Sequence, residues 1–350
     1  MDYINYVKQS PMSMGGMGGV VGSYNFRSGV NIEDWAGGRG FQAGGYAPAP
    51  FPSPYHTNEV QYFTITNLSA NATDFGNLSS GKQAPVGISQ KSRLLMCGGR
   101  PWNSGAVKTV DRFNPDSHSN ATGWGDLYQG VAFNGGNSNG TRGVIMSGNG
   151  NPSTGGSTYL QIQYMTILTD ASGADFGDMN NTTGQGCQGY AKAGIQGNDT
   201  RSVIAGGEAG ATSGFDVGIG YVTTATTGNA VAFGDLNYKL FYAGGCSNAT
   251  RAMFFGNATP NNEEKCQYIT VATTGNATTF ADMPTSGWSN VSANACASNG
   301  SGDIGISMGN SAPYASECCS KTISTTANAV NFGNLIRDMG YGSQGAAGGS

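Results

Sequence analysis

One sequence pattern recurs along the chain at intervals of roughly 50 residues. Each copy has a Tyr-x-Thr-Ile-like stretch and a turn containing Asn-Ala. An aromatic residue, Gly, Asp or Asn, and then Leu or Met follow. The six aromatic residues that mark the copies are Phe75, Trp124, Phe176, Phe233, Phe280 and Phe332. A repeat of this length forms one supersecondary unit per copy, so the units must pack against one another to bury a core.

A second signature lies between the copies of the first: Arg, a few apolar residues, and then a Gly pair or Gly-Asn. Its copies begin at Arg39, Arg93, Arg142, Arg201 and Arg251, and the sixth has Asp303 in place of Arg. An Ala/Gly-rich segment, such as residues 240–246, precedes the Arg. Each unit therefore holds about four short strands, as one propeller blade does, and six units predict six blades.

The two ends of the chain complement each other. Residues 339–349 resemble the Ala/Gly-rich strand but stop where an Arg strand should follow, and that strand is found at residues 37–45. We therefore expect one blade to be built from both ends. Pairing the ends removes two exposed sheet edges and closes the ring. The propeller then spans residues 37–350.

Composition agrees with an all-β fold. The chain contains 58 Gly, only 11% of its residues are charged, and no stretch has a sustained helical period. These features exclude helical bundles, coiled coils and doubly wound α/β enzymes. The 4 Trp, 16 Tyr and 15 Phe are spread along the sequence, which argues against disorder.

The repeated residues have expected structural roles. The aromatic residue should fill the gap between neighbouring blades, Gly should permit tight turns, and the Asp or Asn after it should bond to its own backbone in a turn. For the Arg two roles remain open. It forms an ion pair with the Asp of the first signature, or its alkyl chain covers apolar neighbours.

Residues 1–36 are expected to lie outside the ring. They include the Gly/Met-rich run 12–20, which cannot form a core of its own. We predict an extended tail that anchors the propeller to another protein.

Charge and cysteine usage narrow the class of partner. The net charge is −4 and no basic run exceeds two residues, which disfavours nucleic-acid binding. No apolar run is long enough to cross a membrane and no secretory signal is visible, so we predict no membrane insertion. The seven Cys have no paired CxxC spacing, and we interpret them as buried residues of a protein made in a reducing cytosol.

The repeats resemble those of kelch-related propellers. Copies such as residues 268–278, with Tyr-Ile-Thr-Val and Gly-Asn-Ala, are similar in particular to repeats in structural proteins of tailed viruses that infect marine cyanobacteria. Asp303 and Ala281 depart from the pattern. The resemblance implies a virion component, such as a tail fibre or other appendage, assembled in the host cytoplasm.

Binding residues are expected in the loops that follow each Gly-Gly strand, because variable loops on a rigid scaffold carry recognition. These loops are residues 101–103, 149–157, 208–215, 259–265 and 311–316. Trp102 and Tyr314 are the candidates for stacking on a sugar, and packing against their own blade is the alternative role.

No catalytic residue, metal site or cofactor is predicted. The chain has only two His, His56 and His118, and lacks Asp-box turns and calcium-loop motifs. Four glutamates, Glu208, Glu263, Glu264 and Glu317, follow Gly-Gly strands and could share one face as a glycosidase would need, although solvated loop charges are the preferred interpretation. The Asn-x-Ser/Thr sequons, which include Asn71, Asn120, Asn248 and Asn276, are expected from composition rather than glycosylation.

These observations predict a non-enzymatic virion structural protein. Its tail, residues 1–36, would bind other virion proteins, and its exposed face would bind a host-surface glycan or receptor. A head or neck decoration protein without a receptor role is the first alternative. A propeller glycosidase that acts on the host envelope is the second.

Overall fold

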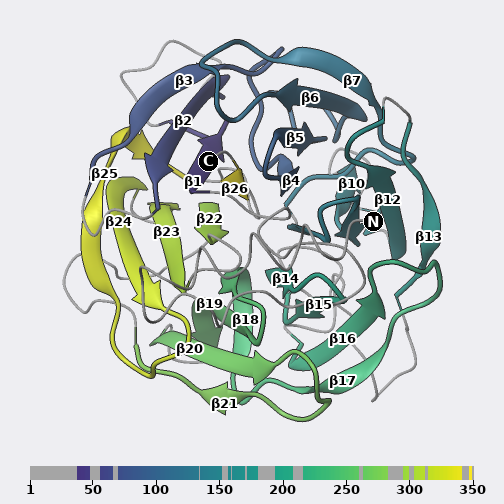
Figure 1. Ribbon diagram of the computed structural model, residues 1–350, viewed down its shortest axis with the longest axis vertical. Coiled ribbons are helices and arrows are strands. Elements are labelled where there is room, and N and C mark those ends of the chain that lie inside the picture. The colour runs from purple at the N-terminus through teal and green to yellow at the C-terminus, as the bar shows by residue number, and fades with distance from the viewer. Residues whose placement is uncertain are drawn as a thin grey trace, which may run out of the picture.

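The computed structural model describes residues 38–47, 56–65, 70–133, 135–151, 157–158, 160–169, 172–179, 194–207, 216–259, 263–282, 295–298, 303–311, 314–340 and 347–348. The predicted tail, residues 1–36, lies outside them. Six four-stranded antiparallel sheets stand around a common axis, as Figure 1 shows in a view along it. The described residues contain strands and turns but no helix. The prediction of an all-β, six-bladed propeller is confirmed.

From the axis outwards, blade 1 has β26 (Ala347–Gly348), β1 (Arg39–Ala43), β2 (Glu59–Thr64) and β3 (Thr73–Asn77). In the same direction, blade 2 has β4 (Val86–Gln90), β5 (Arg93–Cys97), β6 (Thr109–Phe113) and β7 (Thr122–Asp126). Blade 3 has β8 (Gly136–Ser138), β9 (Arg142–Met146), β12 (Gln161–Thr166) and β13 (Ala174–Asp178), with the small hairpin of β10 (Asn149–Asn151) and β11 (Ser157–Thr158).

The second half of the ring repeats this order. Blade 4 has β14 (Gly194–Gly197), β15 (Arg201–Ala205), β16 (Gly218–Thr223) and β17 (Val231–Asp235). Blade 5 has β18 (Lys239–Ser247), β19 (Arg251–Thr259), β20 (Glu263–Thr270) and β21 (Thr278–Thr279). Blade 6 has β22 (Ala295–Ser298), β23 (Ile304–Ser311), β24 (Tyr314–Thr322) and β25 (Val330–Met339).

Both ends of the chain build blade 1, as predicted. The C-terminal strand β26 is its innermost strand and pairs with β1, with Arg39 opposite Gly348 and Gly40 opposite Ala347. Figure 1 shows the purple and yellow strands side by side at this place. The pairing supplies the partner that the inner edge of β1 would otherwise lack.

The predicted alignment of the sixth unit is wrong by one residue. In four blades the Arg lies opposite a Thr of the third strand, as Arg142 lies opposite Thr166. In blade 6 the residue in that register position is Ile304, opposite Thr322. Asp303 precedes it, and its Oδ1 accepts hydrogen bonds from Asn248 Nδ2 at 2.9 Å and the Ser324 backbone N–H at 2.8 Å. The spacing of the repeat could not decide between the adjacent residues Asp303 and Ile304 as the counterpart of the Arg.

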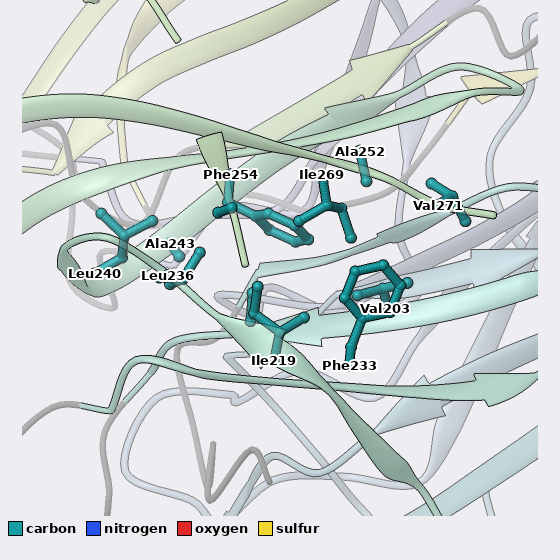
Figure 2. Close-up of a cluster of buried hydrophobic side chains, with 12 residues drawn as sticks. Val203, Ile219, Phe233, Leu236, Leu240, Ala243, Ala252, Phe254, Ile269 and Val271 are labelled. Atoms are coloured by element: carbon teal, nitrogen blue, oxygen red, sulfur yellow. The ribbon is translucent and has the colours of Figure 1, made fainter. Parts of the chain in front are cut away.

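Six hydrophobic clusters join the blades, and each contains one of the six repeat aromatics. Figure 2 shows the cluster between blades 4 and 5, where Phe233 of β17 lies among residues of both sheets. The other five aromatics occupy corresponding clusters, each containing residues of the following blade. All six are at most 6% exposed. Burial of a Phe side chain contributes about 1.5–3 kcal/mol, so these residues hold neighbouring sheets together.

Backbone hydrogen bonds link the outer strand of a blade to the next blade. Gly275 and Ala277 of blade 5 donate to the carbonyls of Phe233 and Asp235 at 2.9 and 2.8 Å, and Asp235 donates to Asn276 Oδ1 at 3.0 Å. The sequons Asn71 and Asn120 make the same contact as Asn276. Asn of the Asn-Ala turn thus caps the preceding blade. The sequence predicted that the Asp or Asn after the repeated Gly closes a turn by bonding to its own backbone. The outer strand is instead held by the Asn side chain and the backbone of the next blade.

Six cysteines lie within the described residues, namely Cys97, Cys246, Cys266, Cys296, Cys318 and Cys319, and all are buried and none of them forms a disulfide. Burial raises the pKa of the Cys97 thiol, and it raises those of Cys318 and Cys319 as well. Cys187 lies outside the described residues.

Candidate functional site

The ring has two distinct faces because successive strands run in opposite directions. The loop after the second strand of a blade and the connection to the next blade emerge on one face, which we call the loop face. The turns between the first and second strands and between the third and fourth emerge on the other, which we call the turn face.

The predicted recognition loops lie on the loop face, but several are shorter than expected. Residues 259–265 and 311–316 are largely the ends of paired strands, with Ser311 opposite Tyr314 at a hairpin tip. Residues 149–157 include most of the β10–β11 hairpin. Residues 101–103 belong to a turn outside the strands, and residues 208–215 lie outside the described part of the chain. Blade 2 therefore carries the clearest loop candidate.

The two predicted sugar-stacking residues are not brought together. Trp102 belongs to blade 2, whereas Tyr314 begins β24 of blade 6, and blade 1 separates them. The prediction that the glutamates occupy loops is also wrong for those described. Glu263 and Glu264 begin β20, and Glu317 lies within β24, because these hairpins continue the sheet. Glu208 lies outside the described residues.

Trp102 stands at the tip of a tight turn and is 41% exposed. The Ser104 backbone N–H donates to the Pro101 carbonyl at 3.4 Å, and Asn103 has a φ of 53°, a left-handed conformation that Asn tolerates. Val107 donates to the Gly99 carbonyl at 3.0 Å and closes the base of the loop. The local sequence thus projects one large aromatic ring from a constrained turn.

A ring of the preceding blade supports the indole. The imidazole of His56 meets Trp102 edge to face with centroids 5.4 Å apart, and the centroids of the Tyr46 and His56 rings are 5.9 Å apart. Burial and the positive charge of Arg100 lower the pKa of His56 to about 4. His56 is therefore neutral at pH 7 and acts as an aromatic support for Trp102.

Arg100 places a positive charge at the base of the same turn. Its backbone pairs with Gln83 in both directions, at 2.9 and 3.0 Å, and its Nε donates to the Ser104 carbonyl at 3.4 Å. Among the described residues no carboxylate forms an ion pair with it. Sequence reasoning missed Arg100 and His56. Arg100 is adjacent to a predicted loop, but only the packing of blade 1 against blade 2 brings His56 to Trp102.

On the turn face, the five repeat arginines make the same two kinds of contact, although the ring is a Tyr of the third strand in four blades and Trp124 of the outer strand β7 in blade 2. Each guanidinium lies over an aromatic ring and donates to a backbone carbonyl in the turn of the next blade. The stacked pairs are Arg39–Tyr62 at 4.8 Å, Arg93–Trp124 at 4.5 Å, Arg142–Tyr164 at 4.2 Å, Arg201–Tyr221 at 4.5 Å and Arg251–Tyr268 at 4.4 Å. The accepting carbonyls are those of Pro115, Leu168, Ala225, Val271 and Ser324.

This geometry differs from the ion pair that the sequence left open as one role of the arginines. No Asp of the first signature forms an ion pair with these arginines among the described residues. The planar guanidinium instead combines a cation–π contact with a hydrogen bond to the next blade. Blade 6 lacks both halves of the contact, since Ile304 replaces the Arg and Ser320 occupies the position of the Tyr. The paired loss agrees with a direct Arg–aromatic interaction.

Replacing Arg142 by Ala should lower the free energy of unfolding by about 2 kcal/mol. The variant loses the stacking on Tyr164 and the 2.8 Å hydrogen bond to the Ala225 carbonyl. Urea denaturation measures the change. Asp178→Asn is the matched control, because blades 1 and 6 already have Asn at that position, and it should change stability by less than about 0.5 kcal/mol. An equal loss of stability in Arg142→Ala and Asp178→Asn would show that Arg142 acts through an ion pair with Asp178.

The described residues contain no group of three or more His, Cys, Asp or Glu arranged to hold a metal ion. Within the same ranges no helix is long and apolar enough to cross a membrane.

Comparison with known proteins supports the fold. The solved structure described as "Structure of YjhT" matches with a TM-score of 0.57 at 11% sequence identity, over 76% of this chain and 88% of that chain. No family model matches the sequence, and no curated protein matches it. At this identity the similarity establishes the propeller architecture alone.

Proposed function

We propose that the chain is a non-enzymatic structural protein of a tailed-virus particle, displayed on an appendage such as a tail fibre. Residues 1–36 anchor it to other virion proteins, and the loop face binds a host-surface glycan or protein. Assembly takes place in the host cytoplasm. The virion assignment is supported by the resemblance of the repeats, and the recognition role by the constrained, exposed Trp102 turn.

The Trp102 turn is the observation that carries the recognition role. Exposed aromatic rings are common anchors of binding sites because they offer a large apolar area at a small loss of conformational entropy. The indole is held by its own turn and by His56, so little ordering remains to oppose binding.

Binding of the purified full-length protein to host cells tests this function. We expect labelled protein to bind the cells and to slow adsorption of the virus. Trp102→Ala should weaken cell binding about tenfold or more. Leu168→Ala is the matched control, because Leu168 is 52% exposed but lies on the turn face, and it should bind normally.

Other results would favour the alternatives. A protein that does not bind cells but coats the head or neck would be a decoration subunit. Release of sugars from purified host envelope would make it a glycosidase.

A further inference from the structure

The chemistry around Trp102 restricts what this turn can bind. The other exposed large hydrophobic residues of the described chain do not form one patch with Trp102: Val330 and Ile336 lie on β25 of blade 6, Leu168 and Val231 lie in blades 3 and 4, and only Tyr128 belongs to the same blade. A stable protein interface buries about 800 Å² on each partner around an apolar core. One aromatic ring on a short turn suits a smaller ligand, such as a single sugar ring.

The charge beside the ring restricts the ligand further. Arg100 lies two residues before Trp102, and its Nε is directed to the Ser104 carbonyl, which fixes the guanidinium at the base of the turn. No acidic side chain of the described residues neutralises it, and its neighbour His56 is neutral at pH 7. An Arg side chain can bind a carboxylate through two parallel hydrogen bonds, which gives both affinity and orientation.

We propose that the turn of residues 101–104 is a subsite for an anionic sugar, a pyranose that carries a carboxylate. The apolar C–H face of the sugar stacks on the indole of Trp102, and its carboxylate binds the guanidinium of Arg100. His56 is a positioning residue that holds the indole from behind. This inference rests on the proposed host-recognition function and names the ligand class for it.

Equilibrium binding to two simple glycosides tests the proposal. Methyl glucuronide has the carboxylate and methyl glucoside has the same ring without it, and both are titrated into the full-length protein. We expect the glucuronide to bind at least about tenfold more tightly, since hydrogen bonds between charged partners are stronger than those between neutral ones. Equal affinity for the two sugars, or no binding of either, would overturn the proposal.

Two substitutions separate the two contacts. Arg100→Gln should remove the preference for the glucuronide and leave the weak affinity for the ring. Trp102→Ala should abolish binding of both sugars. Lys91→Gln, which removes an exposed positive charge on the turn face, should change neither affinity. Unchanged thermal midpoints show that the variants are folded. A full preference for the glucuronide in Arg100→Gln would contradict the assigned contact.

The cell-binding assay distinguishes failure of this inference from failure of the proposed function. Cell binding without glucuronide binding overturns the sugar subsite and leaves host recognition standing. If protease treatment of the cells then removes the binding, the partner is a protein. Glucuronide binding without cell binding supports the subsite and contradicts the host-recognition function.

Discussion

Asp111→Ala should destabilise the propeller by about 3–5 kcal/mol, because it leaves the ammonium group of Lys82 buried without a counter-charge. Lys82 and Asp111 form an ion pair of 2.8 Å, and their side chains are 0% and 2% exposed. No other hydrogen-bond acceptor reaches Lys82 Nζ within the described chain. Chemical denaturation measures the loss in free energy of unfolding.

Other blade junctions supply the control for this prediction. Three other blades have Gln at the register position of Asp111, and Gln267 of blade 5 is one of them. At the junction between blades 4 and 5, the position that corresponds to Lys82 is occupied by the apolar residue Leu240. The Gln amide contacts the preceding blade, as Gln267 does with the Tyr238 carbonyl at 3.1 Å.

A double variant can therefore copy a solution that the ring already uses. Lys82→Leu with Asp111→Gln should differ from the parent by no more than about 1 kcal/mol, because a buried ion pair is often replaceable by neutral groups of similar volume. A double variant as unstable as Asp111→Ala, or an Asp111→Ala variant of normal stability, would show that the charges do not balance each other as described.

Gly234→Ala should cost about 3 kcal/mol, because the added methyl group would overlap backbone of the next blade. A Cβ at Gly234 would lie 2.2 Å from the Gly275 carbonyl oxygen. That carbonyl cannot move away easily, since the Gly275 N–H is bonded to the Phe233 carbonyl at 2.9 Å. The thermal midpoint and the free energy of unfolding should both fall.

Gly228→Ala is the matched control. Gly228 lies in the turn before the same outer strand, and a Cβ there would meet nothing within 4 Å. Its stability should remain within about 0.5 kcal/mol of the parent or rise slightly. If both alanines are tolerated equally, the repeated Gly is not required by the close approach of the next blade.

The fifth unit shows this constraint within the chain itself. Ala281 replaces the repeated Gly there, and the outer strand β21 has only 2 residues, whereas β17 has 5. The hydrogen bond to the next blade is also longer here, since Ala329 N–H donates to the Asp282 carbonyl at 3.3 Å, compared with 2.8 Å from Ala277 to Asp235. The departure at Ala281, visible in the sequence, thus corresponds to a shortened strand.

The number of blades and the closure of the ring could be predicted because they depend only on the number of repeat units and on the two chain ends. Six units predict six blades, and complementary partial units at the two ends predict one blade shared between them. The partner of the repeat arginines could not be predicted, because it depends on register. Placing Arg142 opposite Thr166 brings Tyr164 to the guanidinium, and a shift of one strand position would have placed it elsewhere.

The candidate site was only half predictable for the same reason. Trp102 can be identified from its place after the Gly pair 98–99, which follows the second strand of blade 2. Its support, His56, lies in a different blade and becomes its neighbour only after the ring has formed. The strand positions of Tyr314 and Glu263 could not be predicted, because apolar spacing does not reveal how far a hairpin extends beyond its sheet.

The position of the protein on an intact particle is the most direct test of the account. An antibody raised against the propeller, with gold detection, is applied to purified particles of the tailed virus that we propose as the source of the chain, and the particles are viewed by electron microscopy. We expect label at the tail tip or fibres, where the loop face can meet a host surface. Label confined to the head or neck would contradict the recognition role. The absence of label from every particle would contradict the virion assignment itself.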